Sequence, residues 1–360
     1  MYCHLTHRAD LWRHRRGYAP QWRTSFRIVA SLCALAGALL GPGHLSAAQT
    51  DILGPAGSVA FGTAVYVLPN GNIVVTDTAA PGANQGAVYL FSPAGALLST
   101  LTGGHPNDTL GNGGITVLTN GNYVISSPAW NGGAGAVTWG DADTGVAGVV
   151  SSANSLVGSI SGHEVGAGGV TRLANGNYVV SSRFWDDGGT SNVGAVTWGD
   201  GSSGTVGVVS AANSLVGTSD DDQVGIGGAA ALPNGHYVVI SFDWDDGATP
   251  DVGAVTWGDG VSGITGTVSP ANSLVGTALD DRIGEYGVTV LSNSNYVVSS
   301  PFWDDDEGTI DVGAVTWSDG SSGTADVVSA TNSLVGILPD DRIGFSGVTA
   351  LANGHYVVLS

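Results

Sequence analysis

The sequence has very little cysteine, and this absence limits its chemistry. Cys3 and Cys33 are the only cysteines, and both lie within the first 48 residues. The rest of the chain therefore has no disulfide, no cysteine–metal site and no thiol nucleophile. The first 48 residues have the composition of a removable leader, so these exclusions apply to the mature chain.

Basic residues are also scarce, and lysine is absent from the whole chain. After residue 48 the acidic residues number 29, which are the 30 of the chain less Asp10. Phosphate binding needs clustered lysine and arginine, so nucleic acid is excluded as a partner. An acidic surface suits divalent cations or basic partners. The only basic residues after residue 48 are Arg172, Arg183, Arg282 and Arg342.

Residues 1–48 have the organisation of a secretory signal peptide. Six arginines precede an apolar run at 28–40, a Gly41-Pro42 break follows, and Ser46 and Ala48 supply the small residues of a cleavage site. The run is shorter than the roughly 20 residues that a membrane-spanning helix needs. We expect an exported protein, located outside the cell, at its surface or in the periplasm, with no transmembrane segment after cleavage. A membrane anchor or a misassigned start is the alternative.

Residues 49–360 are predicted to form one repeat domain, because two markers recur at a period of about 60 residues. Gly-Ala-Val-Thr-Trp ends at Trp139, Trp198, Trp257 and Trp317. Asn-Ser-Leu-Val-Gly begins at Asn154, Asn213, Asn272 and Asn332. The copies span roughly 61–110, 111–165, 166–224, 225–283, 284–343 and, in part, 344–360.

Each copy reads as four β-strands, since no segment shows the apolar period of a helix. In the copy from residue 224, we expect strands at 229–232, 236–241, 252–257 and 264–268, with residues 272–276 leading into the next copy. An Asn-Gly turn, such as Asn234-Gly235, separates the first two strands and predicts a type I′ hairpin with positive φ at both residues.

The fold class is therefore all-β. We expect a β-propeller of about 60-residue, four-stranded repeats with six or so blades, in a complete or incomplete ring; a linear β-repeat array is the alternative. The first hairpin occurs six times, whereas the third and fourth strands occur five times. Either the ring is incomplete or the chain is a fragment of a longer protein.

The first copy carries a family resemblance. It has Phe61-Gly62, an apolar strand, a turn, a second strand and then Gly86-Ala-Val-Tyr-Leu-Phe91. This resembles the FG-GAP repeat of integrin α-subunit propellers, and the later copies resemble repeats of bacterial filamentous-haemagglutinin-like surface proteins. The resemblance implies an adhesive surface protein. The calcium loop of the FG-GAP family is not expected here, because the turn Asn120-Gly121-Asn122 has no carboxylate.

Dense carboxylates mark the loops between the second and third strands. Calcium takes six to eight oxygen ligands, so these loops are candidate calcium sites. No loop has the spacing of an EF-hand, and solvated turns, turn caps or ion pairs such as those of Asp281-Arg282 are the alternative. The candidate calcium ligands are Asp243, Asp245, Asp246, Asp251, Asp304, Asp305, Asp306 and Asp311; no other cofactor is expected.

The same loops carry one tryptophan in each copy. A ring of exposed indoles would provide stacking platforms for carbohydrate, whereas buried indoles would pack between blades. The candidate ligand-binding residues are Trp130, Trp185, Trp244 and Trp303.

No catalytic constellation recurs among the copies. His236 and His355 occupy a turn position that is asparagine in other copies, and no phosphate loop or nucleophile elbow is present. We therefore predict a non-catalytic, exported structural or adhesion module that binds an unknown surface protein or a glycan. A lectin-like carbohydrate-binding propeller and a propeller enzyme, a hydrolase or lyase, are the alternatives.

Overall fold

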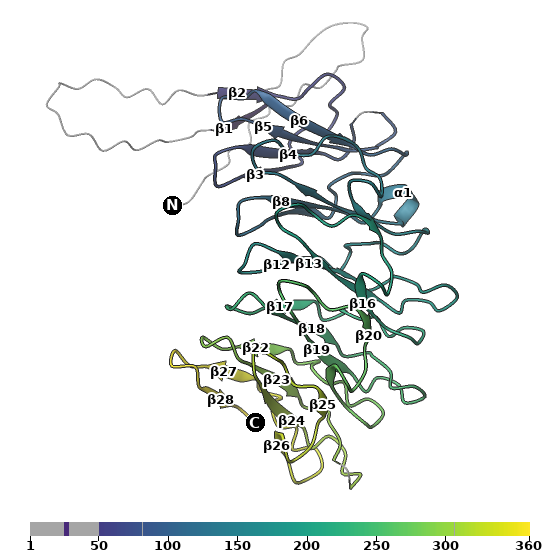
Figure 1. Cartoon of the computed structure of the whole chain (residues 1–360), viewed down its shortest axis with the longest axis vertical. Coiled ribbons are helices and arrows are strands. Elements are labelled where there is room, and N and C mark those ends of the chain that lie inside the picture. The colour runs from purple at the N-terminus through teal and green to yellow at the C-terminus, as the bar shows by residue number, and fades with distance from the viewer. Residues whose placement is uncertain (1–24, 29–49, 81, 306) are drawn as a thin grey trace, which may run out of the picture.

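The protein is a row of small antiparallel β-sheets stacked along one axis. The structure, a computed structural model, describes residues 25–28, 50–80, 82–305 and 307–360. The sheets follow each other in chain order, and the first and last lie at opposite ends of the molecule (Figure 1). The all-β class and the blade-like repeated sheet are thus as predicted, and the blades form an open row. The predicted leader lies outside the described residues except for β1 (Ser25–Ile28), which pairs with β2 (Thr50–Leu53).

Four strands of each complete sheet come from one copy of the repeat, in antiparallel order. Sheet 1 contains β3 (Ala64–Val67), β4 (Ile73–Asp77), β5 (Ala87–Phe91) and β6 (Leu97–Thr102). Sheet 2 contains β7 (Gly114–Val117), β8 (Tyr123–Ser127), β9 (Ala136–Gly140) and β11 (Leu156–Val157). Sheet 3 contains β12 (Val170–Arg172), β13 (Tyr178–Ser182), β14 (Ala195–Gly199) and β16 (Ser214–Val216).

The next sheets repeat this order, and the last one has two described strands. Sheet 4 contains β17 (Ala229–Ala231), β18 (Tyr237–Ser241), β19 (Ala254–Gly258) and β21 (Ser273–Val275). Sheet 5 contains β22 (Val288–Val290), β23 (Tyr296–Ser300), β24 (Ala314–Ser318) and β26 (Ser333–Val335). Sheet 6 contains β27 (Val348–Ala350) and β28 (Tyr356–Val358). Among the described residues, the single element assigned as a helix is α1 (Trp130–Gly133), a four-residue turn in which Asn131 and Gly132 have positive φ.

A fifth strand joins each of the first four sheets from the following copy. β20, for example, pairs in parallel with β16 of the sheet before it, and β21 then completes its own sheet. The expected fourth strand at 264–268 is therefore wrong: this segment belongs to the preceding sheet, and residues 273–275 form the fourth strand. This exchange ties neighbouring copies together through backbone hydrogen bonds. The exchanged strands are β10 (Gly148–Val149), β15 (Gly207–Val208), β20 (Gly266–Thr267) and β25 (Asp326–Val327).

The Asn-Gly hairpins form as expected, but their turn type differs. Gly235 has a φ of 93°, whereas Asn234 is not among the positive-φ residues. The Gly235 N–H donates to Leu232 O, and the Leu232 N–H donates to His236 O. This is a three-residue hairpin loop with glycine in the left-handed position, rather than a two-residue type I′ turn. The asparagine instead accepts the His236 N–H through its side chain.

The apolar core lies between consecutive sheets. One cluster combines Val124 of sheet 2 with Tyr178 and Val180 of sheet 3, all nearly inaccessible to solvent. Equivalent clusters fill the other junctions. Inside sheets 2, 3 and 4 a buried threonine hydroxyl meets a buried serine hydroxyl, as at Thr197 and Ser214, 2.7 Å apart. Each sheet therefore depends on its neighbours for burial, as in other repeat proteins.

A hydrogen-bonded lock holds one side of the row together. The carbonyl oxygen of Gly260 in sheet 4 accepts three side-chain donors from sheet 3: Asn175 Nδ2 at 2.7 Å, Asn177 Nδ2 at 2.8 Å and Trp198 Nε1 at 3.0 Å. Trp139 and Trp257 bond Gly201 and Gly320 in the same way. These third-strand tryptophans therefore stabilise the contacts between sheets.

The lock defines one of two opposite edges of the row. The hairpin edge carries the first hairpin of each sheet and the turn after the third strand. The loop edge carries the loops between the second and third strands and the loops that lead from one sheet to the next. The loops between the second and third strands cover 78–86, 128–135, 183–194, 242–253 and 301–313. The inter-sheet loops, which lead from one sheet to the next, cover 103–113, 158–169, 217–228, 276–287 and 336–347. Within the described residues no helix is long and apolar enough to span a bilayer.

Candidate functional site

The loop edge contains every candidate site residue that the structure describes, and buried aspartates hold its loops in place. Asp222 Oδ2 accepts the backbone N–H groups of Thr218 at 2.6 Å and Ser219 at 2.8 Å. Its Oδ1 accepts the N–H of Asp245, in the neighbouring loop, at 2.9 Å. One carboxylate thus joins two loops. Asp108 and Asp281 form the same three bonds in their copies.

Asp222 and Asp281 remain costly to ionise despite their three donors. Burial raises the pKa of Asp281 to about 6 and also raises the pKa of Asp222. Asp341 accepts two equivalent N–H groups but is more exposed, and those hydrogen bonds lower its pKa. The sequence analysis considered Asp281 only as a turn cap or ion-pair partner and did not single out this buried position. The available signal was its fixed position, three residues before the glycine of each inter-sheet loop.

His163 takes the place of this buried aspartate in one copy. Its side chain is 2% exposed, and neither ring nitrogen has a hydrogen-bond partner among the described residues. Nε2 lies 4.0 Å from Asp186 Oδ2, and the ring packs edge-on against Trp185. Burial lowers the pKa of His163, and Asp186 only partly opposes this effect. The junction between sheets 2 and 3 therefore differs chemically from the others.

The loop tryptophans are structural. Trp244 is 3% exposed and Trp303 1% exposed, and each lies in the apolar cluster between two sheets. Trp130 and Trp185 are equally enclosed. A stacking platform has to expose its ring face, so the prediction that these four residues bind carbohydrate is wrong. They pack between the blades, which was the alternative.

The acidic loops are held by internal hydrogen bonds and two arginines. Asp245 and Asp304 accept the N–H groups of Asp251 and Asp311, which lie further along the same loops. Arg282 lies 3.1 Å from Asp251 and 3.5 Å from Asp243. Each loop is therefore closed by its own carboxylates, and the arginine ties it to the next inter-sheet loop.

The predicted calcium ligands do not come together as a site. Asp305 caps the N–H groups of Glu307 and Thr309, and Asp246 pairs with Thr249 only through its backbone. Asp306 lies outside the described residues. Among the residues that the structure does describe, no three His, Cys, Asp or Glu side chains are grouped so as to hold a metal ion. The carboxylates face backbone donors and arginines, so the calcium prediction is not supported by this geometry.

Exposed aromatic side chains occur at the loop edge of sheets 5 and 6, where the sequence had not indicated them. Tyr286 and Phe345 are 42% and 46% exposed. The Tyr286 ring lies 5.1 Å from that of Phe345 and 5.6 Å from that of Phe302. We call Tyr286, Phe302 and Phe345 the aromatic patch. Its signal in the sequence was weak, because the three residues come from three separate loops, and no other copy has an aromatic residue at the positions of Tyr286 and Phe345.

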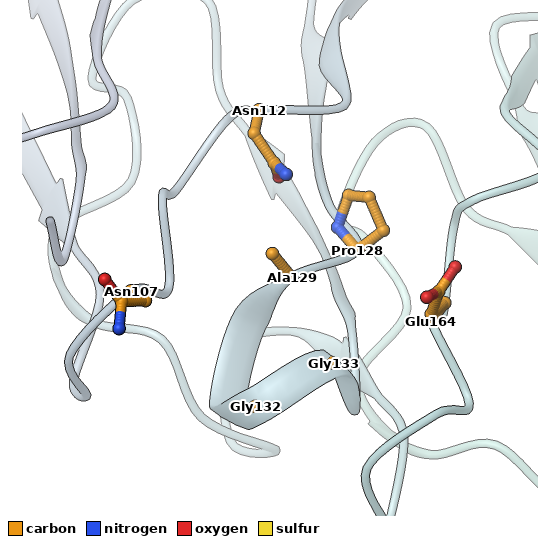
Figure 2. Close-up of a pocket in the computed structure, with 7 residues that line it drawn as sticks. All are labelled: Asn107, Asn112, Pro128, Ala129, Gly132, Gly133 and Glu164. Carbon is orange, nitrogen blue, oxygen red and sulfur yellow. The ribbon is translucent and has the colours of Figure 1, made fainter.

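A shallow hollow of about 460 Å³ opens at the loop edge between sheets 1 and 3 (Figure 2). Asn112 and Pro128 lie on one side of it, and Glu164 lies beyond Pro128. Its lining is small and polar and has no aromatic platform, so its chemistry suits water and weak polar contacts. It is lined by Asn107, Asn112, Pro128, Ala129, Gly132, Gly133 and Glu164.

The repeating unit matches a known family model. The model is described as "Repeat of unknown function (DUF5650)" and matches residues 117–167, 172–226, 231–285 and 290–345, which is more than half of the chain. The chain belongs to this family. Each DUF5650 match runs from the end of one first strand to the inter-sheet loop before the next. The FG-GAP resemblance of residues 61–91 lies outside the matched residues and stays a prediction.

Comparisons beyond the DUF5650 family add little. No curated protein matches the sequence. Among solved structures, the chain is similar to a virginiamycin B lyase from Staphylococcus aureus, at 9% identity and a TM-score of 0.35, over 85% of this chain and 80% of that one. It is also similar to a protein of unknown function from Bacteroides caccae, at 13% identity and a TM-score of 0.28, over 75% and 80%. Neither similarity is close enough to support a conclusion about activity.

Proposed function

We propose that this DUF5650 chain is an exported, non-catalytic binding module of a bacterial surface, and that it holds a surface protein or a glycan at its loop edge. The main support is a contrast between the two edges of the row. The hairpin edge repeats one set of contacts from sheet to sheet, with a tryptophan and an asparagine bonding one carbonyl oxygen. Such a scaffold can hold different side chains in fixed positions.

At the loop edge, equivalent positions carry different chemistry in successive copies. The position two residues before each loop tryptophan is Pro128, Arg183, Phe242 or Pro301. The position that follows the conserved glycine of the inter-sheet loop is Asn112, Ala167, Ile226, Glu285 or Phe345. A constant framework with varied residues along one edge is the arrangement that repeat proteins use for extended binding surfaces.

The histidines favour a non-catalytic role. His236 Nδ1 accepts the backbone N–H of Gly260 at 3.1 Å, which is the bond that Asn177 makes to Gly201 in sheet 3. His163 is enclosed and faces only Asp186 and Trp185. Both side chains therefore serve the packing of the row. Detectable hydrolase or lyase turnover by the purified, monodisperse chain would contradict this part of the proposal.

The test measures the binding of beads coated with the chain from residue 49 to cultured cells and to a glycan array. A loop-edge variant carries Arg183→Ala and Phe242→Ala, and the control carries Val261→Ala, which removes a 69% exposed side chain at the hairpin edge. We expect the loop-edge variant to bind at least about tenfold more weakly, since few interface residues carry most of the affinity, and the control to bind normally. The proposal fails if the unsubstituted chain binds nothing, or if both variants bind alike.

Export is tested separately, by the mass of the mature protein recovered outside the cytoplasm. Cleavage after Ala48 would leave Gln49 as the first residue. A mature protein that keeps residues 1–48 and remains in the cytoplasm would rule out the exported location.

A further inference from the structure

The aromatic patch places two exposed aromatic rings, those of Tyr286 and Phe345, together at the loop edge. Its rings come from the inter-sheet loops 276–287 and 336–347 and from the intervening loop 301–313. Tyr286 contacts both other rings, and both of its partners, Phe302 and Phe345, come later in the sequence. At the position equivalent to Tyr286, the three preceding inter-sheet loops have a glycine, as at Gly227, and the following loop has Ser346. The patch is therefore local to this end of the row and is not required by the repeat.

Aliphatic side chains of the same three loops are also exposed. Leu279 is 58% exposed, Ile310 59% and Leu338 59%. The N–H of Asp340 donates to Ile310 O at 3.2 Å, so Ile310 lies beside the loop that carries Leu338 and Phe345. Apolar residues that gather on one exposed surface with a polar rim mark sites of contact with other proteins.

The rim of the patch is negatively charged. Arg342 lies over the Phe302 ring at 5.5 Å, but Asp311 and Asp340 already bind its guanidinium group at 2.6 and 3.0 Å. In the adjacent loop, Arg282 is similarly occupied, with Asp280 at 3.6 Å among its partners. The side chains of Asp280 and Asp340 are 60% and 66% exposed. The arginines therefore leave an excess of negative charge around exposed rings.

We propose that the aromatic patch docks a positively charged segment of another protein, with its arginine or lysine side chains over the rings of Tyr286 and Phe345 and beside Asp280 and Asp340. Ring faces attract cations, and the surrounding carboxylates add to this attraction. Aliphatic side chains of the same segment pack on Ile310 and Leu338. The acidic composition of the repeat domain steers a basic partner toward this surface, and salt weakens that steering. This inference rests on the proposed role of the loop edge as a binding surface.

The test titrates the chain into a short, fluorescein-labelled peptide of alternating arginine and leucine. A peptide with citrulline in place of arginine keeps the shape and removes the charge. The test variant carries Tyr286→Ala and Phe345→Ala, and the matched control carries Trp317→Ala, which removes an aromatic ring that is 44% exposed near the hairpin edge. Thermal unfolding confirms that both variants fold. We expect binding of the arginine peptide that is at least about tenfold weaker for the patch variant and unchanged for the control.

Three outcomes would overturn the inference. Equal binding of the arginine peptide to the patch variant and the unsubstituted chain would mean general charge attraction alone. If the citrulline peptide binds the unsubstituted chain as tightly as the arginine peptide does, the aromatic patch does not recognise cations. The third outcome is that the arginine peptide does not bind, whereas a glycan binds the unsubstituted chain but not the variant with Arg183→Ala and Phe242→Ala. In that case the loop edge keeps its proposed function, and the proposal of a basic partner is refuted.

Discussion

Two tryptophans with the same local sequence allow the contacts between sheets to be measured. Trp257 and Trp317 both end the segment Gly-Ala-Val-Thr-Trp. Trp257 is half-buried at the junction of sheets 4 and 5, and its Nε1 donates to Gly320 O at 3.0 Å. Trp317 is 44% exposed. Replacing each by alanine removes the same atoms from the same kind of strand. The difference between the two losses of unfolding free energy therefore measures what the contact between sheets 4 and 5 contributes.

The expected magnitude follows from the burial and the hydrogen bond. Truncating a fully buried tryptophan costs about 3–5 kcal/mol, so half-buried Trp257 accounts for about 2 kcal/mol. The lost hydrogen bond adds about 1 kcal/mol. We expect Trp257→Ala to lower the free energy of unfolding by about 3 kcal/mol, and Trp317→Ala by less than about 1 kcal/mol, as at exposed positions.

The assay is urea unfolding followed by far-ultraviolet circular dichroism, because the substitutions alter the fluorescence. The slope with urea has to be compared as well, since a long repeat row can lose its cooperativity. If the two variants lose equal stability, the third-strand tryptophans do not lock neighbouring sheets and this explanation of the repeat is wrong.

Three further predictions use the same assay. Asp281 has a pKa of about 6 when folded against an ordinary 3.8, so its contribution to stability rises as the pH falls from above 6 toward 3.8. Between pH 7 and 4.5 this gain amounts to about 2 kcal/mol, at about 1.4 kcal/mol for each pH unit below the folded pKa. The gain in the free energy of unfolding should be smaller by this amount in Asp281→Asn than in the unsubstituted chain, whereas Asp341→Asn, at a position whose pKa is lowered, should keep it. The pKa of His163 is lowered, so the neutral ring contributes stability above its ordinary pKa of 6.5, and this stability is lost as the pH falls below 6.5. Between pH 7 and 5 the unsubstituted chain should therefore lose stability relative to His163→Gln. If the stability of the two proteins changes with pH in parallel, this explanation is wrong. An alanine Cβ at Gly260 would lie 1.7 Å from Gly235 O, so Gly260→Ala should lower the free energy of unfolding by about 3 kcal/mol or more. An alanine Cβ at Gly189 meets open space, so Gly189→Ala should lower it by less than about 1 kcal/mol. Similar losses of stability in the two variants would contradict the close approach of Gly260 to Gly235.

The sequence was sufficient to predict the sheets but not their connections. Markers such as Gly-Ala-Val-Thr-Trp and Asn-Gly fix strands and hairpins locally, because turn chemistry and apolar runs act over a few residues. The exchange of β20 into the preceding sheet depends on pairing with β16, about 50 residues away. No local pattern distinguishes a segment that pairs within its own sheet from one that pairs with the sheet before.

The loop residues were harder to interpret for the same reason. The local sequence of a tryptophan beside aspartates, such as Trp244, is compatible with a sugar-binding platform and equally with a side chain packed between two sheets. Its burial is decided by the neighbouring sheet. In the same way, Asp222 and Asp221 are adjacent acids, yet only Asp222 points inward to three N–H groups. The exposed Tyr286 and Phe345 lie far apart in the sequence and meet only in the folded row.

Small-angle X-ray scattering of the chain from residue 49 tests most directly whether the sheets form an open row with its loop edge accessible along its length. A compact fold of this length has a radius of gyration of about 20 Å. The open row predicts a clearly larger radius and the distance distribution of an elongated particle. A radius near about 20 Å with a compact, symmetric distribution would mean that the sheets close on one another, and it would contradict the extended binding surface proposed here.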